Sequence, residues 1–269
     1  MGEGAGGAQA EQLAAAADGR PVLKGQVALV TGGGAGIGRA CVERLAAAGV
    51  HVLLMDRNAG RAAEVARSAR THETDVEVSV AEATRESDVA GAVAATLGRW
   101  GRLDILVTCA GGFRSASPLQ DVPLREWDEI VAANLTATFL ACRMAIPVMR
   151  RQRYGRIVNV ASMAARTALP QSAHPYAAAK AAVVGLTRQL ALEVAADGVT
   201  VNAVAPGVVL SPRVARLSAD RLRALAEETP MRRTGTPQEV AHAICYLADP
   251  GASYVTGITL DVNGGRFIG

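Results

Sequence analysis

The sequence predicts one doubly wound α/β domain, with a seven-stranded parallel sheet and helices on both of its faces. Three observations support this fold class. Short β-branched runs alternate along the chain with longer, Ala-rich amphipathic segments, which is the order of a strand–helix–strand fold. The strand runs are continuously apolar, as expected when helices cover both sheet faces. No linker divides the 269 residues, half of which are apolar, so we expect a single domain.

The expected strands are short and rich in Val, Ile and Leu: Gln26–Val30, His51–Met55, Val76–Val80, Ile105–Val107, Arg156–Val160, Thr200–Ala203 and Thr259–Val262. The expected helices lie between them: Gly36–Ala48, Arg57–Arg70, Glu86–Trp100, Leu124–Arg151, Pro175–Ala196 and Pro237–Leu247. Residues 1–20 are rich in Gly and Ala and predict a flexible N-terminal extension before a domain over residues 21–269. The polar, Arg-rich segment Ser211–Pro230 predicts a mobile helical lid.

Composition excludes several classes of function. A net charge of +3 and 3% aromatic residues are too little for a nucleic-acid partner. No uncharged apolar run approaches the ~20 residues that span a bilayer, so we expect no membrane partner. The four cysteines and four histidines do not show metal-ligand spacing. The sequence therefore predicts no metal site, no disulfide framework and a cytoplasmic location.

A glycine-rich turn directly follows the first expected strand. Within Thr31–Gly38, glycines at Gly32, Gly36 and Gly38 let the backbone turn sharply and approach a pyrophosphate. The helix that follows offers free N–H groups and the positive end of its dipole. A strand, glycine turn and helix in this order predict a dinucleotide site.

An acidic residue ends the second expected strand. Asp56 stands about 20 residues after the turn, where a carboxylate accepts hydrogen bonds from the adenosine ribose hydroxyls. It would also repel a 2′-phosphate, and Ala35 in the turn supplies no basic side chain to bind one. These residues favour NAD over NADP, although Arg57 could turn toward such a phosphate.

A tyrosine and a lysine share one helical face. Tyr176 and Lys180 are four residues apart, which places their side chains one turn from each other. A free phenol titrates near ~10, and we expect the lysine cation and an oxidised nicotinamide to lower the pKa of Tyr176. Ser162 follows the fifth strand, so its hydroxyl should reach the carboxyl edge where open α/β sheets bind ligands.

Together these motifs resemble the short-chain dehydrogenase/reductase family over residues 25–269. The residues that carry the resemblance are Thr31–Gly38, Asp56, Asn134, Ser162, Tyr176–Lys180 and Pro206–Gly207. The resemblance implies a Rossmann-like domain and NAD(P)-dependent hydride transfer at a carbonyl or alcohol carbon. It makes Tyr176 the general acid/base and Ser162 the hydrogen-bonding partner of the substrate oxygen. Lys180 would bind the nicotinamide ribose, and Asn134 would hold a water that passes protons to solvent.

The same resemblance implies cofactor contacts from Gly32, Gly34, Gly36, Ile37, Gly38, Asp56, Arg57, Glu82, Ala83, Cys109, Ala110, Gly111, Tyr176, Lys180, Pro206, Gly207, Val209 and Ser211. Three features depart from the family pattern, one of which is a slightly longer loop between Ser162 and Tyr176. Cys109 replaces a common asparagine after the fourth strand, where we expect some loss of local rigidity. Glu82 replaces an aspartate that contacts adenine.

Residues near the expected substrate pocket are Phe113, Arg114, Met163, His174 and Leu210. The pocket is mostly apolar, which favours a medium-sized, partly hydrophobic substrate. Arg114, Arg213 and Arg216 could contact an acidic substrate or belong to the solvated surface.

These features favour an NAD(H)-dependent oxidoreductase that interconverts a secondary alcohol and a ketone. An alternative is an NADPH-dependent 3-oxoacyl-(carrier protein) reductase, whose acidic carrier would dock on the basic run at residues 150–156. A non-catalytic nucleotide-binding regulator is a third hypothesis, which the four catalytic residues disfavour. The resemblance also implies a homotetramer or homodimer, formed by helices Leu124–Arg151 and Pro175–Ala196.

Overall fold

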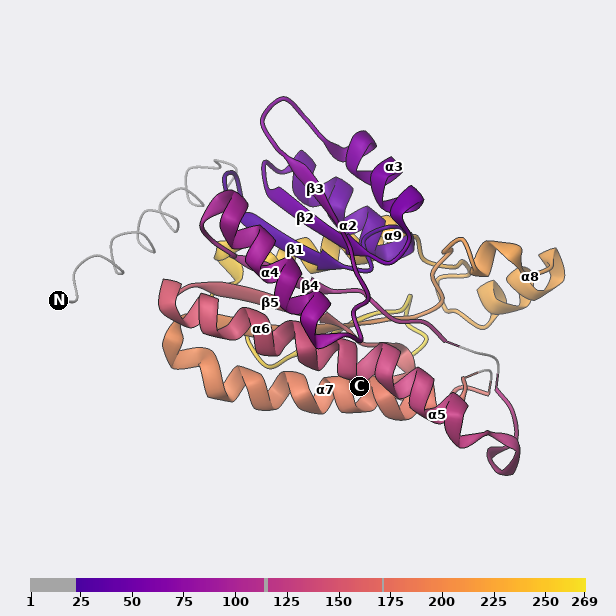
Figure 1. Cartoon of the computed structure of the whole chain (residues 1–269). Helices are drawn as coiled ribbons and strands as arrows, with labels where there is room; N and C mark the ends of the chain where they lie inside the picture. Colours follow the sequence, from indigo (N-terminus) through magenta and orange to yellow (C-terminus); the bar gives the residue numbers. More distant parts are fainter. Residues whose placement is uncertain (1–22, 114–115, 171) are drawn as a thin grey trace.

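The computed structural model describes residues 23–113, 116–170 and 172–269. The predicted extension over residues 1–20 and the candidate Arg114 lie outside them. Seven parallel strands form one sheet in the order β3-β2-β1-β4-β5-β6-β7 (Figure 1), which confirms the predicted Rossmann-like fold. The strands are β1 Val27–Thr31, β2 His51–Asp56, β3 Val76–Val80, β4 Ile105–Thr108, β5 Gly155–Val160, β6 Val199–Pro206 and β7 Thr259–Val262.

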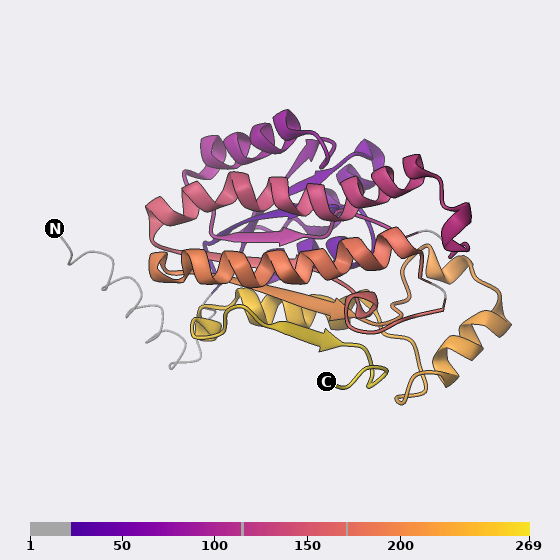
Figure 2. The ribbon, with the colours of Figure 1, turned by 90° about the horizontal axis from the view of Figure 1, so that it is seen from below.

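Two layers of helices cover the sheet. One layer contains α2 Gly36–Ala47, α3 Ala59–Ala69 and α9 Pro237–Ala248; the other contains α4 Glu86–Trp100, α5 Leu124–Val131, α6 Ala137–Gln152 and α7 His174–Val194. Short 3-10 turns occur at Leu119–Asp121, Met163–Ala165, Ala195–Asp197, Val214–Arg216 and Pro250–Ala252. Helix α8, Ala219–Glu227, lies at the end of the sheet toward which the visible strand arrows point (Figure 2).

The strand residues alternate between two apolar cores. In β1, Leu29 packs with the α4 and α6 layer, whereas Val30 packs with the α2, α3 and α9 layer. Successive side chains of a strand point to opposite faces, so a strand that is covered on both faces must be apolar throughout. Every residue of β1, β4, β5 and β6 is buried. This is the physical reason for the continuous apolar runs in the sequence.

The sheet reverses its winding between β1 and β4, and this reversal opens a crevice at the carboxyl edge. The turn after β1 and the loop after β4 meet there. The Cys109 N–H donates to the Thr31 carbonyl at 3.1 Å, and the Ala110 N–H donates to the Thr31 hydroxyl at 3.3 Å. The order of the strands therefore brings two distant glycine-containing segments together.

The long helix predicted over Leu124–Arg151 contains a change of helix type. Residues Ala132–Thr136 form a π-helical turn between α5 and α6. The stretch Leu124–Gln152 is long and apolar enough to span a membrane by length and composition alone. Half of its apolar window is buried inside the structure, so the fold itself supplies a packing partner for these side chains.

Candidate active site

A cavity of about 780 Å³ lies at the carboxyl edge of the sheet. It is lined by the glycine turn, by the segments that follow β4, β5 and β6, by the start of α7 and by the lid that contains α8. The lid has a 3-10 turn at Val214–Arg216 and then α8, which confirms its predicted helical character.

The glycine turn has no room for side chains on its inner side. Gly32 has φ +66°, and a Cβ there would lie 2.8 Å from the Ala110 backbone. A Cβ on Gly38 would overlap the Gly32 carbonyl oxygen. Helix α2 starts at Gly36 without a side-chain cap or an acid in its first turn, so its free N–H groups are available to an anion. These features fit the pyrophosphate of a dinucleotide.

Asp56 is fixed at the end of β2 beside this turn. Its carboxylate accepts hydrogen bonds from the Gly34 N–H and the Asn58 N–H, each at 2.9 Å. The Arg57 side chain is 80% exposed and lies 3.7 Å from the Glu82 carboxylate. The fixed carboxylate faces the turn, whereas the arginine that could offset its charge is paired with another acid. The arrangement fits the hydroxyl groups of a ribose.

Cys109 is held in the loop after β4 by a second thiol. Its side chain lines the cavity and lies close enough to the Cys41 thiol of α2 to affect its pKa. Its backbone N–H is paired with β1. These contacts fix the loop without the amide of the usual asparagine. The neighbouring Cys109 thiol, and then burial, raise the pKa of Cys41 well above its ordinary value.

Asn134 lies fully buried in the π-helical turn Ala132–Thr136. Its amide nitrogen donates to the Gly112 carbonyl at 2.8 Å and to the Ile130 carbonyl at 2.9 Å. Its amide oxygen accepts from the Gly112 N–H at 3.1 Å. The side chain therefore fixes the loop after β4 to the helix. Its role in holding a water remains a prediction.

Tyr176, Ser162 and Lys180 all line the cavity. Ser162 Oγ accepts from the Ala164 N–H at 3.1 Å, and the Ser162 hydroxyl is close enough to the Tyr176 phenol to lower its pKa. Lys180 Nζ donates to the Val160 carbonyl at 2.7 Å and lies 5.9 Å from the centre of the Tyr176 ring. The three predicted groups are together at the point where β5 meets α7.

The pKa of Tyr176 differs from the sequence-based prediction. Burial raises it, while the Ser162 hydrogen bond and the positive charge of Arg213 act in the opposite direction. Lys180 is not among the groups that shift the pKa of Tyr176, so the structure does not show the lowering that was expected from it. Burial lowers the pKa of Lys180 itself to about 8, and its ammonium group is directed to the Val160 carbonyl. A phenol with a raised pKa is a proton donor at neutral pH.

Only some of the residues predicted to contact the substrate line the cavity. Phe113 lines it, whereas Met163 is buried in the core at 1% exposure. His174 and Leu210 are exposed at the surface and lie outside the lining. Met163 follows Ser162 into a 3-10 turn that directs it inward, and His174 is the first residue of α7. The nearby apolar lining includes Leu169, Pro170, Val214, Leu217 and Leu225.

Comparison with known proteins gives the family. A family model described as enoyl-(acyl carrier protein) reductase matches residues 32–266. The short-chain reductase protein NovJ of Streptomyces niveus is 42% identical over 253 residues, which cover 91% of this chain and 95% of that protein. The chain belongs to the short-chain dehydrogenase/reductase family. Membership makes it an NAD(P)-dependent oxidoreductase.

Other members of the family support this assignment. A 3-oxoacyl-[acyl-carrier-protein] reductase of Synechocystis is 38% identical, over 90% of this chain and 97% of that protein. The crystal structure of a 3-oxoacyl-[acyl-carrier protein] reductase from Brucella melitensis has a TM-score of 0.88 at 32% identity, over 93% of this chain and 94% of that one.

The cofactor contacts that the family implies fall into two groups. Those that line the cavity are Gly36, Ile37, Gly38, Cys109, Gly111, Tyr176, Lys180, Pro206, Gly207, Val209 and Ser211. Those outside its lining are Gly32, Gly34, Asp56, Arg57, Glu82, Ala83 and Ala110. Ala83 packs in the core with the α4 and α6 layer, so its side chain does not face the cavity. The lid, α3 and the C-terminal segment also supply lining residues that were not predicted from the sequence: Arg61, Pro212, Val214, Leu217, Arg221, Leu225 and Arg266.

The basic run proposed for docking a carrier protein is engaged within the fold. Arg150 and Arg153 each bond Asp197 at 2.8 Å, and Arg156 is 3% exposed. The run lies where α6 ends and β5 begins, at the edge of the sheet opposite the cavity. Arg150 and Arg153 keep 39% and 56% of their side-chain surface exposed in these ion pairs, so docking of a carrier protein on this run stays a prediction.

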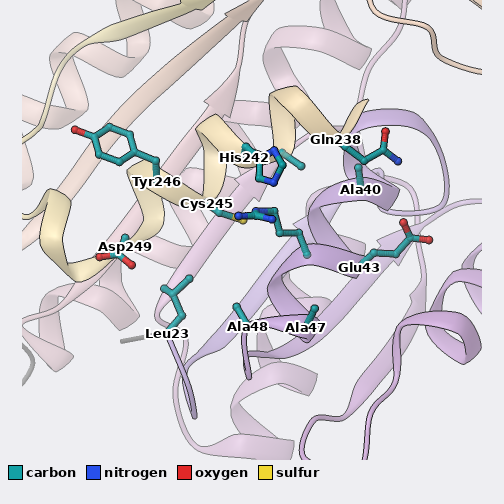
Figure 3. A pocket seen from close by; sticks show the side chains of 12 residues that line it. Leu23, Ala40, Glu43, Ala47, Ala48, Gln238, His242, Cys245, Tyr246 and Asp249 are labelled. Atoms are coloured by element: carbon teal, nitrogen blue, oxygen red, sulfur yellow. The ribbon is translucent and has the colours of Figure 1, made fainter. Parts of the chain in front are cut away.

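A second hollow lies away from the catalytic groups. It is formed between α2 and α9, whose side chains face each other across it (Figure 3). Cys245 is hydrogen-bonded to Arg44 in this hollow, and burial raises the pKa of the Cys245 thiol to about 11. A protonated thiol is a poor nucleophile, so this hollow does not compete with the cavity as a catalytic site.

Proposed function

We propose that this enzyme is an NADH-preferring reductase of 3-oxoacyl thioesters and related 3-oxo compounds. The observation that carries the proposal is the meeting of Ser162, Tyr176 and Lys180 in one cavity with the glycine turn. The substrate class is supported by the 3-oxoacyl-[acyl-carrier-protein] reductases that the chain resembles over nine tenths of its length. The preference for NADH is supported by the Asp56 carboxylate beside Gly34.

Bound NADH would supply the hydride to the carbonyl carbon. The glycine turn and the free end of α2 would bind its pyrophosphate, and Asp56 would accept hydrogen bonds from its ribose. Ser162 would donate a hydrogen bond to the carbonyl oxygen. Tyr176 would transfer its proton to that oxygen as the C=O bond becomes a C–OH group, which balances the reduction to an alcohol. Lys180 would then help to restore the proton of Tyr176.

A second candidate is a reductase of free ketones, the secondary alcohol/ketone reaction. It is favoured by the pairing of Arg150 and Arg153 with Asp197, which offsets part of the positive charge of the expected docking surface for a carrier protein. The apolar residues of the cavity also suit an uncharged ketone of medium size.

Initial-rate assays with NADH and NADPH would separate these candidates. We expect acetoacetyl-coenzyme A to be reduced with kcat/KM at least about tenfold above that of cyclohexanone, and NADH to exceed NADPH by a similar factor. Faster reduction of cyclohexanone would favour the second candidate. Binding of NADH without reduction of any carbonyl compound would contradict both.

The proposal includes a homotetrameric or homodimeric assembly in the cytoplasm. Phe139 on α6 and Leu192 on α7 are 43% and 79% exposed, and such apolar side chains favour burial against a second copy. Cys41, Cys109, Cys142 and Cys245 are free thiols, which suits a reducing compartment. Light scattering of the purified chain would measure the mass of the assembly, and a monomer would contradict this part of the proposal.

A further inference from the structure

We propose that the substrate carries an anionic group, and that Arg213, Arg221 and Arg266 bind it on the lid side of the cavity. The inference rests on the proposed carbonyl reduction and names a property of its substrate. The other described residues around this part of the cavity are apolar or uncharged.

The charges that line the cavity are all positive among the described residues. They are Arg61, Lys180, Arg213, Arg221 and Arg266, with no aspartate or glutamate among them. The Lys180 ammonium group already donates a hydrogen bond to the Val160 carbonyl. Arg61 belongs to α3, and its Cβ lies near the adenosine side of the glycine turn. The three remaining arginines come from the lid and the C-terminal segment, on the substrate side.

Arg213 is held close to the reacting groups. Its guanidinium lies over the Phe113 ring, with Cζ 4.1 Å from the ring centre, and donates to the Phe113 carbonyl. The Phe113 ring lies 5.9 Å from the Tyr176 ring. The positive charge of Arg213 reaches the Tyr176 phenol and favours the phenolate. In the described part of the chain this guanidinium has no acidic partner.

Arg221 and Arg266 form the second part of the cluster. The Arg266 side chain is 11% exposed and is paired with Glu228. Arg221 is close enough to lower the pKa of Arg266, in addition to the effect of burial. Glu228 compensates one of these two charges, and the described residues provide no acid for Arg221. An anion between Arg213 and Arg221 would relieve this excess of positive charge, and guanidinium groups bind carboxylates and phosphates through paired hydrogen bonds.

Leu217 and Leu225 of the lid line the same cavity as these arginines. The cavity thus combines a carbonyl-binding end, an apolar wall and a cationic rim. This combination suits an amphipathic substrate whose anionic group is either its own carboxylate or the phosphate of a thioester arm.

The experiment compares two pairs of substrates that differ in charge. One pair is 5-oxohexanoate and its methyl ester, and the other is acetoacetyl-coenzyme A and acetoacetyl-N-acetylcysteamine. We expect kcat/KM for the anionic member to exceed that of its neutral partner about tenfold or more in at least one pair, with a smaller excess at high salt. An excess in the first pair assigns the charge to a carboxylate, and an excess in the second pair alone assigns it to a phosphate.

Arginine variants then test which residues recognise the charge. Arg213→Gln and Arg221→Gln should each reduce the ratio of anionic to neutral kcat/KM by about tenfold. Arg216→Gln is the matched control, because Arg216 is an exposed lid arginine outside the lining, and it should leave the ratio unchanged. Equal reduction of both members in both pairs would overturn the inference and leave the proposed reductase intact.

Binding measurements keep the two proposals distinguishable. If no carbonyl compound is turned over, the proposed function fails, and calorimetric titration of the NAD⁺-loaded enzyme with 5-oxohexanoate decides the inference by itself. Binding that weakens in Arg213→Gln but not in Arg216→Gln would support the cationic site. Equal binding by all variants, both of 5-oxohexanoate and of acetoacetyl-coenzyme A, would overturn it.

Discussion

The two ends of the cavity are built by different means. At the nucleotide end, the glycine turn fits closely against its neighbours: a Cβ on Gly32 would lie 2.8 Å from the Ala110 backbone, and a Cβ on Gly34 would lie 2.8 Å from the Asp56 carboxylate. At the substrate end, long side chains such as Arg213 and Arg221 extend from a lid with many exposed residues. The first end recognises a constant ligand through its backbone, whereas the second end can change its specificity by exchange of side chains.

The largest expected effect is that of Tyr176→Phe, which should lower kcat but leave NADH affinity nearly unchanged. Tyr176→Phe removes the proton donor and should lower kcat for carbonyl reduction by about 10²–10⁴-fold. NADH affinity, measured by fluorescence titration, should change less than about threefold, because the glycine turn and Asp56 remain intact. Retention of most of the activity would contradict the acid role of Tyr176.

A substitution at the nucleotide end should instead weaken NADH binding and the stability of the fold. Gly38→Ala places a Cβ against the Gly32 carbonyl and should lower the free energy of unfolding by about 2–3 kcal/mol. It should also weaken NADH binding. Gly91→Ala is the matched control, since Gly91 lies in α4 with nothing within 4 Å of its Cβ position. That change should stabilise the protein by about 0.5–1 kcal/mol in urea denaturation. Similar losses in the two variants would contradict the close packing of the turn.

Lys180 is expected to lower stability in a pH-dependent manner. Its pKa falls from 10.5 to about 8 on burial, so the unfolded chain binds the proton more tightly than the folded chain between these pH values. The penalty is full below pH 8 and disappears as the pH rises toward 10.5. A shift of this size corresponds to roughly 3 kcal/mol, from which the lost hydrogen bond to Val160 subtracts about 1 kcal/mol.

Lys180→Met should therefore stabilise the protein by about 2 kcal/mol at pH 7, and the gain should shrink above pH 8. Denaturation at several pH values measures this difference. Lys24→Met provides the comparison, because Lys24 is an exposed partner of Glu73 and its loss should matter little. A destabilised Lys180→Met at pH 7 would contradict the burial penalty.

The smallest expected effect concerns the choice of nucleotide. Asp56→Ala removes the carboxylate beside Gly34 and should shift the ratio of kcat/KM for NADPH over NADH upward by about tenfold. Asp56→Asn removes the charge but keeps a hydrogen-bond acceptor, so a similar shift there would attribute the preference to charge. An unchanged ratio in both variants would assign nucleotide selection elsewhere, with Arg57 as the first residue to test.

The sequence predicted the nucleotide end better than the substrate end. Short-range motifs specify the glycine turn, Asp56 and the Tyr176–Lys180 pair, because strand order and helical spacing fix where their side chains point. All seven strands occur where apolar runs predicted them, although β6 extends to Pro206 because both of its faces are covered. The burial of Met163 and the exposure of His174 depend on how one turn packs against the rest of the fold.

Long-range contacts explain the remaining misses. The approach of Arg266 to the cavity depends on the path of the C-terminal segment after β7, and no local pattern around residue 266 encodes it. The pKa of Tyr176 likewise depends on burial and on Arg213, 37 positions away in a separate segment. Sequence spacing alone linked Tyr176 to Lys180, whereas the fold directs the lysine to the Val160 carbonyl.

The π-helical turn at Ala132–Thr136 has a consequence for how the chain tolerates change in length. A π turn contains one residue more than an α-helical turn, and one residue corresponds to about 100° of rotation around the axis. Deleting a single residue there would convert the turn to regular helix and rotate α5 relative to α6. Either α5 would lose its packing against α7, or Asn134 would lose its hydrogen bonds to Gly112. The extra residue thus fixes the rotation of α5 relative to α6 about their common axis. We therefore expect Ala132–Thr136 to accept substitutions far more readily than deletions.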